Sequence, residues 1–393
     1  MQRLAVRQNP TFLAARQETD IARGALRQAG IYQFNPELGL VAPGGAGGAA
    51  SPYELTLSQV VEWAGQRGLR VDAARHGVTR ATSVVRDAAR VTVASASAAF
   101  YRALASQQRL RLAEEVFALN ERLVRAVRTQ LAEGEISALE GNLAEIEFGR
   151  ARARVLAARR ASATAELALK RELGVDPATP VRLSDDMTAP LPSGVAPDSL
   201  VTLALARRPD LAARVAATRQ AATLASLARR EGIPNLRVGA VGEQDRDGGN
   251  SRVGLTVGLG VPLFNRNQGL VAQRQAEARR SALELAATEL GVRTDVRDAA
   301  NAYRAASDEA AVFEASVLEP ARRNMPLLEE AYRAGKVPLP TLLLLRNQLL
   351  DAELGYWDAW LARREALVAL QAATGAPAPA LGDATDTSGR TTR

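Results

Sequence analysis

The sequence contains no cysteine and only one histidine, His76. Without cysteine the chain has no disulfide bond, no zinc–thiolate site and no lipidated cysteine. A lone histidine cannot form a metal cluster, and on a helix it is more often a surface or packing residue. Apart from Met1, the methionines are Met187 and Met325, too few for a copper relay. We therefore predict neither a resident metal ion nor a cofactor.

Long apolar runs and targeting signals are also missing. No stretch approaches the roughly 20 apolar residues of a membrane helix, and the first residues lack the basic-then-apolar pattern of a signal peptide. Taken alone, this predicts a cytoplasmic protein; a mature or truncated chain would look the same. There is no Gly-x-x-x-x-Gly-Lys-Ser/Thr loop and no grouping of nucleophile, base and acid, so we predict no enzymatic activity.

Lysine and aromatic residues are scarce. The net charge of +7 is carried by arginine, and aromatic residues make up 4% of the chain. A basic balance can indicate nucleic acid or an acidic membrane surface. Here the arginines are spread beside Asp and Glu, which is typical of solvated helix faces. The acidic pair Asp185-Asp186 is interpreted in the same way, as solvated rather than as a cation site.

The abundance of Ala, Leu, Val and Arg favours long, closely packed helices.

What the sequence does contain is an internal duplication. The strings at 9–12, 36–38, 101–103, 131–134 and 173–174 return at 208–211, 234–236, 303–305, 332–335 and 374–375. We therefore divide the chain into a first repeat (1–175), a proline-rich linker (176–199) with a short strand at 181–183, a second repeat (200–375) and a disordered tail (376–393). Each repeat is expected to run helix, β-hairpin, long helix, turn, helix.

The β-hairpin is clearest in the second repeat. Residues 252–261 alternate strictly, with Val253, Leu255, Val257, Leu259 and Val261 on one face. Arg252, Thr256 and glycines lie on the other face. This strand follows 236–241 across a polar loop. A weaker hairpin joins 38–41 to 55–57 through a glycine loop at 44–48.

The long helices follow from proline-free stretches with apolar spacing. A helix from about 11 to 33 precedes the first hairpin, and a helix from about 65 to 131 would be roughly 100 Å long. Residues 342–370 keep the spacing of a coiled-coil seam. Turns are expected at Gly134 and Gly335, and Pro320 and Pro326 predict a kink in the second long helix.

Four strands cannot close a barrel of useful size. Closure between three copies would give twelve strands and remove every sheet edge, with the apolar face toward lipid. The alternative is a soluble β-hairpin that caps a helical rod, with Val and Leu packed on helices. The pattern alone leaves both open.

Three strings carry a family resemblance. Arg-Pro-Asp-Leu at 208–211, Gly-Val-Pro-Leu-Phe-Asn-Arg-Asn-Gln-Gly at 260–269 and Tyr-Arg-Ala-Gly-Lys-Val at 332–337 resemble TolC-type outer-membrane factors. The string at 262–269 is most similar to the branch that serves heavy-metal efflux (cobalt, zinc, cadmium, copper). The resemblance covers about residues 4 to 375. It implies a mainly α protein with a small β part, whose homotrimer forms a 12-stranded β-barrel in the bacterial outer membrane on a 12-helix periplasmic α-barrel.

The resemblance also implies a function. The chain would be the passive exit duct of a tripartite efflux system, with heavy-metal cations as the expected substrate. It would contact outer-membrane lipid, a periplasmic adaptor protein and, through the adaptor, an inner-membrane resistance-nodulation-division pump, and it would bind no nucleic acid. A drug-efflux or type I secretion duct of the same fold is the nearest alternative. A soluble coiled-coil scaffold or an Arg-rich nucleic-acid-binding protein is the alternative of another class.

In such ducts the turns of the helical hairpins form the periplasmic entrance and the adaptor contact. The corresponding residues are Leu131, Gly134, Glu135, Ile136, Ser137, Tyr332, Arg333, Gly335, Lys336, Val337 and Pro338. Some relatives carry cation-binding acidic residues just after the second turn. The aligned positions here are Thr341 and Leu344, with Lys336 and Arg346 nearby, so we expect a periplasmic constriction that is apolar or basic.

Overall fold

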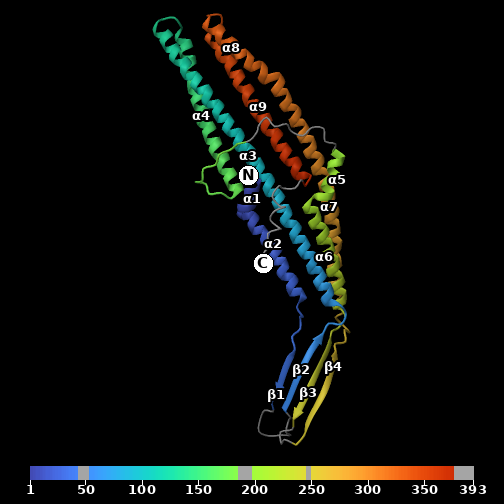
Figure 1. Cartoon of the computed structure of the whole chain (residues 1–393). Helices are drawn as coiled ribbons and strands as arrows, with labels where there is room; N and C mark the ends of the chain where they lie inside the picture. The colour runs from blue at the N-terminus through green and yellow to red at the C-terminus, as the bar shows by residue number, and fades with distance from the viewer. Residues whose placement is uncertain (43–52, 185–196, 245–248, 376–393) are drawn as a thin grey trace, which may run out of the picture. The chain divides into compact units, whose positions relative to one another are not determined.

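The structure is a computed structural model that describes residues 1–42, 53–184, 197–244 and 249–375. The predicted glycine loop at 44–48, the acidic pair at 185–186 and the predicted tail at 376–393 lie outside these ranges. In chain order the elements are α1 (Gln2–Gln8), α2 (Pro10–Gly30), β1 (Glu37–Val41), β2 (Tyr53–Val61), α3 (Gln66–Ala132), α4 (Ala138–Leu173), α5 (Pro197–Arg207), α6 (Pro209–Glu231), β3 (Leu236–Gln244), β4 (Ser251–Leu259), α7 (Gln268–Val312), η1 (Phe313–Leu318), α8 (Glu319–Arg333) and α9 (Leu339–Ala373) (Figure 1).

The chain divides into two compact units. The helical unit comprises Met1–Ala15, Asp87–Arg208 and the described residues from Gly291 onward. The sheet unit comprises Arg16–Arg86 and Pro209–Leu290. Each unit contains segments of both sequence repeats, so the two repeats interleave within each unit.

The four strands form one antiparallel sheet in the order β1-β2-β3-β4 (Figure 1). The pairs β1–β2 and β3–β4 are the two hairpins that the alternating pattern predicts. Pairing of β2 with β3, from Tyr53↔Gln244 to Val61↔Leu236, joins the hairpins into a single layer. β1 and β4 form the edges of this sheet, and an edge strand presents backbone groups that can pair with another chain.

The predicted helices are confirmed with small shifts of their ends. The first long helix, expected at about 65 to 131, is α3 (Gln66–Ala132). Small side chains let α1, α3 and α4 pack closely; their cluster consists of Ala5, Ala96, Ala99, Ala103, Leu169 and Leu173. None of the helices in the described ranges is both long enough and apolar enough to span a membrane.

Equivalent breaks interrupt the helices at the start of each repeat. Asn9 separates α1 from α2, and Arg208 separates α5 from α6. Each residue is buried and precedes a proline that begins the next helix, where a missing N–H has no cost. The Asn9 Oδ1 accepts a hydrogen bond from the Phe12 N–H at 3.1 Å, which caps α2.

Glycines at the ends of α4 and α9 lie against these breaks. Gly174 and Gly375 both have a left-handed backbone, with φ of +68° and +67°. A Cβ on Gly174 would stand 2.4 Å from the Gln8 carbonyl oxygen, and one on Gly375 would stand 3.1 Å from the Arg208 nitrogen. The duplicated sequence therefore produces the same close backbone contact twice.

The strand predicted at 181–183 is wrong. These residues have no regular secondary structure, and Leu183 packs on the helical clusters that contain Ala103 and Trp360. Three residues of alternating pattern do not specify a strand when no neighbouring strand is present to pair with them.

The second long helix is interrupted near its two prolines. A six-residue π-helix, η1 (Phe313–Leu318), lies directly before α8, in which Pro320 is near the first position and Pro326 is internal. Pro320 cannot donate a backbone hydrogen bond, and its ring clashes with the carbonyl of the preceding turn. The π-helical turn occupies the residues just before this proline. The structure thus shows a π-helical turn at the place of the predicted kink, and the kink itself stays a prediction.

Candidate docking turns and amphipathic sheet

The first turn, residues 131–137, closes the α3–α4 hairpin with a Schellman motif. Gly134 has φ of +76°, its N–H donates to the Leu131 carbonyl, and the Glu135 N–H donates to the Gln130 carbonyl at 2.9 Å. Ser137 then caps α4. Its hydroxyl accepts from the Glu140 N–H, and the Glu140 carboxylate accepts from the Ser137 N–H.

The second turn, residues 332–338, repeats this backbone. Gly335 has φ of +71°, its N–H donates to the Tyr332 carbonyl, and the Lys336 N–H donates to the Ala331 carbonyl at 2.9 Å. Pro338 occupies the N-cap of α9 with the same extended backbone as Ser137, but it offers no capping side chain. Both turns therefore share one hydrogen-bonded backbone geometry.

The two turns carry opposite charge at the same backbone position. Glu135 follows the glycine of the first turn, and Lys336 follows the glycine of the second. Both side chains are exposed, and among the described residues neither forms an ion pair. Neighbouring residues add to this difference, because Glu133 gives the first turn a second negative charge and Arg333 gives the second turn a second positive charge.

An apolar cluster holds the two turns beside each other in the helical unit. Its buried members are Val124, Val127, Ala144, Leu339, Leu342 and Leu343. Ile136 of the first turn and Tyr332 of the second pack against it. Burial raises the pKa of the Tyr332 phenol, and the nearby Glu140 carboxylate raises it further. Of the predicted docking residues, Ile136, Tyr332 and Val337 are partly buried, and the other eight are exposed.

The predicted constriction residues, Thr341 and Leu344, are both exposed on α9. Arg346 is different, because only 15% of its side chain is exposed. Burial lowers the pKa of its guanidinium, the Glu329 carboxylate at 3.9 Å partly offsets this effect, and Arg122 adds to it. Arg346 is thus a largely buried cation inside the helical unit.

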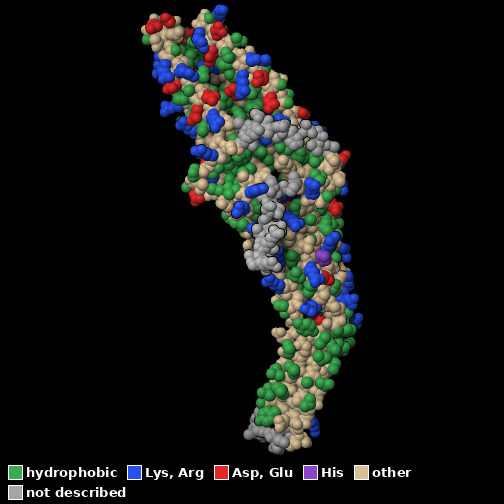
Figure 2. Space-filling view, in the orientation of Figure 1, with side chains coloured by type: hydrophobic (Ala, Val, Ile, Leu, Met, Phe, Trp, Pro, Cys, Tyr) green, Lys and Arg blue, Asp and Glu red, His purple; other side chains and the backbone are tan. Residues whose placement is uncertain are grey.

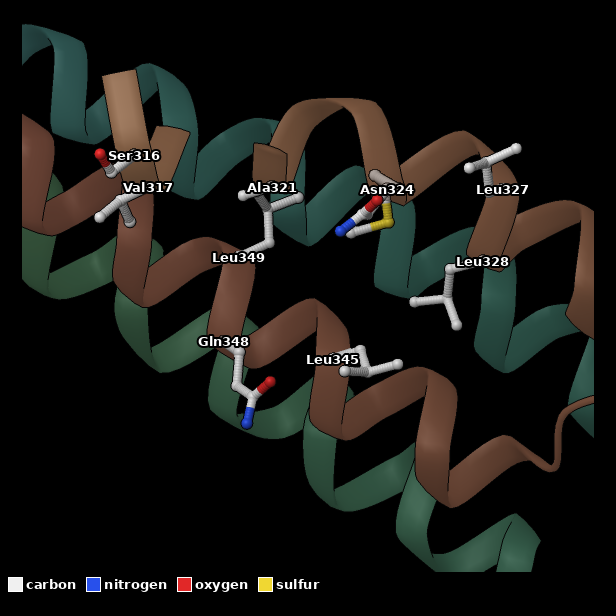
Figure 3. A pocket seen from close by; sticks show the side chains of 10 residues that line it. Ser316, Val317, Ala321, Asn324, Leu327, Leu328, Leu345, Gln348 and Leu349 are labelled. Carbon is white, nitrogen blue, oxygen red and sulfur yellow. The ribbon is translucent and has the colours of Figure 1, made fainter. Parts of the chain in front are cut away.

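Two cavities border this part of α9. A groove of about 600 Å³ lies between α9 and the segment formed by η1 and α8. Leu328 and Leu345 project into it (Figure 3). A smaller cavity contains Arg346 together with four glutamates and Asn347. The Asn347 amide donates to the buried Glu147 carboxylate at 3.2 Å and links α9 to α4. The sequence does not predict this hydrogen bond, because 200 residues separate Asn347 from Glu147.

In the described ranges, no three His, Asp, Glu or Cys side chains are grouped so that they could hold a metal ion. Three of the four glutamates of the small cavity, Glu147, Glu329 and Glu353, form ion pairs with arginines. Glu147 pairs with Arg150 at 2.6 Å, and Glu353 pairs with Arg322 at 3.6 Å. The charged side chains of this region therefore form ion pairs and hydrogen bonds that connect the helices.

The sheet has one apolar face and one polar face. Cross-strand rows place Leu38, Leu57, Ala240 and Leu255 in register, and Leu40, Leu55, Gly242 and Val253 in the next row of the same face. Val253 and Leu255 are 86% and 87% exposed. Figure 2 shows hydrophobic side chains across the sheet with few charges among them. Residues that alternate with these rows form the polar face; they include Glu37, Glu54, Thr56, Arg237, Glu243, Arg252 and Thr256.

The predicted apolar face on β4 is therefore fully accessible. Val253, Leu255, Val257 and Leu259 all lie on it, and Val261 is exposed just beyond the strand. The prediction did not include the leucines of β1 and β2 in the apolar face. The alternation of apolar and polar residues at 53–57 could have revealed those of β2. An exposed apolar area of this extent marks an interaction surface.

Comparison with known proteins identifies the family. The sequence signature described as "Outer membrane efflux protein" matches residues 2–175 and 200–376. The chain belongs to the outer membrane efflux protein family. The family resemblance and the mainly helical fold with a small antiparallel part, both predicted from the sequence, are thereby confirmed.

Individual proteins resemble the chain over most of its length. The cobalt-zinc-cadmium resistance protein CzcC of Cupriavidus metallidurans is 24% identical over 354 residues, which cover 90% of this chain and 84% of CzcC. The pyoverdine export outer membrane protein OpmQ of Pseudomonas putida is 29% identical over 352 residues, which cover 83% of this chain and 71% of OpmQ. A crystal structure of CusC matches with a TM-score of 0.80 at 18% identity and covers 95% of this chain and 91% of CusC.

Proposed function

We propose that this outer membrane efflux protein is the passive exit duct of a tripartite efflux system and works as a homotrimer. The observation that carries the proposal is the amphipathic sheet, with one exposed apolar face, one polar face and two edges. Three copies that pair β4 of one with β1 of the next would close twelve strands. Lipid would then cover the apolar face, and water would fill the polar interior.

The two turns are the proposed contact with a periplasmic adaptor. They are exposed at the ends of their hairpins and share one backbone geometry, as a repeated docking site requires. Energy would come from an inner-membrane pump of the resistance-nodulation-division class, since the sequence has no Gly-x-x-x-x-Gly-Lys-Ser/Thr loop.

Heavy-metal cations are the proposed substrate. Similarity to CzcC, named for cobalt-zinc-cadmium resistance, supports this choice. Export of an organic molecule is the second candidate, which the similarity to OpmQ favours. Thr341 and Leu344 give the proposed constriction no acidic ligand for cations, so the duct would not itself select the metal.

Two measurements test the proposal. The purified full-length protein in detergent should have the mass of three chains and should give discrete conductance steps in a planar lipid bilayer. A monomer without conductance would contradict the duct. Deleting the gene in its native host should then lower resistance to cobalt, zinc and cadmium. Unchanged metal resistance with reduced export of an organic compound would favour the second candidate.

A further inference from the structure

The 262–268 loop, which joins β4 to α7, is fixed by its own side chains. The Gln268 Oε1 accepts from the Arg266 N–H at 2.8 Å, and its Nε2 donates to the Phe264 carbonyl at 3.2 Å. The Asn265 Oδ1 accepts from the Asn267 N–H at 3.0 Å. These bonds hold the loop without any help from its apolar residues.

Asn267 attaches the loop to α6. It is the one residue other than glycine with a positive φ, +63°, in the part of the chain that the structure describes. Asparagine tolerates this left-handed conformation better than most residues. Its Nδ2 donates to the Ala228 carbonyl at 2.8 Å, and a Cβ on Gly232 would stand 2.8 Å from the Arg266 carbonyl oxygen. The loop therefore packs directly against the end of α6.

This rigid loop nevertheless holds Phe264 91% exposed, beside an exposed Leu263. Trp63 is 62% exposed at the same end of the sheet, where its indole N–H donates to the Pro234 carbonyl at 2.9 Å. Tyr32 lies there too, since its hydroxyl donates to the Val60 carbonyl. Covering these exposed side chains with an apolar phase would therefore be favourable.

Unpaired arginines accompany these aromatic residues. Arg27, Arg229, Arg230 and Arg266 are exposed, and none of them forms an ion pair within the described residues. The nearby Glu62 carboxylate is already bound at both oxygens by Arg70, at 2.9 Å each. Arg27, Arg229 and Arg230 complement the carboxyl ends of α2 and α6, but Arg266 lies on no helix, so the helix dipole does not account for the whole set.

We propose that the 262–268 loop and Trp63 anchor the protein at the membrane–water interface, with these four arginines bound to the phosphates of anionic phospholipids. The inference rests on the proposed function, because it places the end of the apolar face at the bilayer edge. Trp and other aromatic residues favour that depth, and arginines just outside it attract anionic headgroups. The apolar face runs directly into the loop, so a lipid surface covers both without a second partner.

Single-cysteine labelling measures the depth of the loop, since the chain has no cysteine of its own. We would attach an environment-sensitive fluorophore to Phe264→Cys in the full-length protein reconstituted into vesicles. Quenching should be stronger with spin-labelled lipids that carry the label near the headgroup than with labels deep in the acyl chains. Val257→Cys reports the apolar face, and Leu139→Cys, on exposed α4 surface, is the aqueous reference.

A set of arginine variants tests the lipid preference. Native mass spectrometry of protein from mixed phosphatidylcholine and phosphatidylglycerol would count retained lipids. Replacing Arg27, Arg229, Arg230 and Arg266 by Gln should reduce phosphatidylglycerol enrichment about ten-fold or more. The matched control replaces four exposed arginines of the helical unit and should leave the enrichment unchanged. These arginines form no ion pair with any residue that the structure describes; they are Arg111, Arg152, Arg304 and Arg323.

The outcomes separate this inference from the proposed function. Quenching at position 257 with a label at 264 that stays in water would overturn the anchor and leave the duct intact. Equal losses of phosphatidylglycerol in both arginine sets would overturn the headgroup contact. A label at 257 that no lipid quenches would overturn the proposed function and the anchor with it.

Discussion

Gly174 and Gly134 share a left-handed backbone but differ in their surroundings. A Cβ at Gly174 would stand 2.4 Å from the Gln8 carbonyl oxygen, whereas a Cβ at Gly134 would meet nothing within 4 Å. Gly134→Ala should therefore cost only the left-handed strain of about 1–2 kcal/mol. Gly174→Ala should cost clearly more, because the end of α4 must also move away from the break before α2. Thermal unfolding of the two purified variants checks this, and equal melting temperatures would contradict it.

Two partly buried phenols should make stability fall at alkaline pH. Burial raises the pKa of Tyr332 and of Tyr356 above the ordinary value. As pH rises through the ordinary tyrosine value of about 10, the unfolded chain loses these protons while the folded chain keeps them, so the free energy of unfolding decreases. The variant Tyr332→Phe/Tyr356→Phe should lose less stability between pH 9 and 11 than the parent, as measured by denaturant unfolding. Tyr53→Phe, on the exposed sheet, is the control and should behave like the parent.

Among the helices and strands, the sequence predicts those that a local pattern of residues specifies. The 65–131 helix and the β4 strand follow from a proline-free stretch and strict alternation, and both are found within a few residues. Pairing of β2 with β3 depends on contacts between distant segments, which no local pattern contains. The prolines locate the interruption of the second long helix, but they do not reveal its π-helical form, and no local pattern reveals that Phe264 is exposed. Residues 181–183 show the opposite error, because their alternation meets no partner strand. The two turns could be located from their glycines, but the inward positions of Ile136 and Tyr332 could not.

The contact between η1 and α9 gives an element-scale prediction. A Cβ on Gly355 of α9 would stand 2.6 Å from the Phe313 ring of η1. Gly355→Ala should therefore destabilise the protein by about 1–3 kcal/mol through overpacking. Truncating the ring makes room, so Gly355→Ala should cost much less in a Phe313→Ala background. A double-mutant cycle by denaturant unfolding measures this coupling, and strictly additive losses would mean that the two helices separate freely.

For the whole molecule, the proposed duct requires that the two faces of the sheet meet different solvents. Leu255 and Thr256 are neighbours on β4 that project to opposite faces, so they form a matched pair. Leu255→Arg would place a charge against hydrocarbon at a cost of about 2–4 kcal/mol, whereas Thr256→Arg would place it in the polar interior at little cost. We expect Leu255→Arg to insert into phospholipid vesicles at least ten-fold less than the parent and Thr256→Arg to insert normally, as measured by co-flotation. If the two variants insert equally well, the apolar face does not meet lipid, and the sheet must bury it against protein.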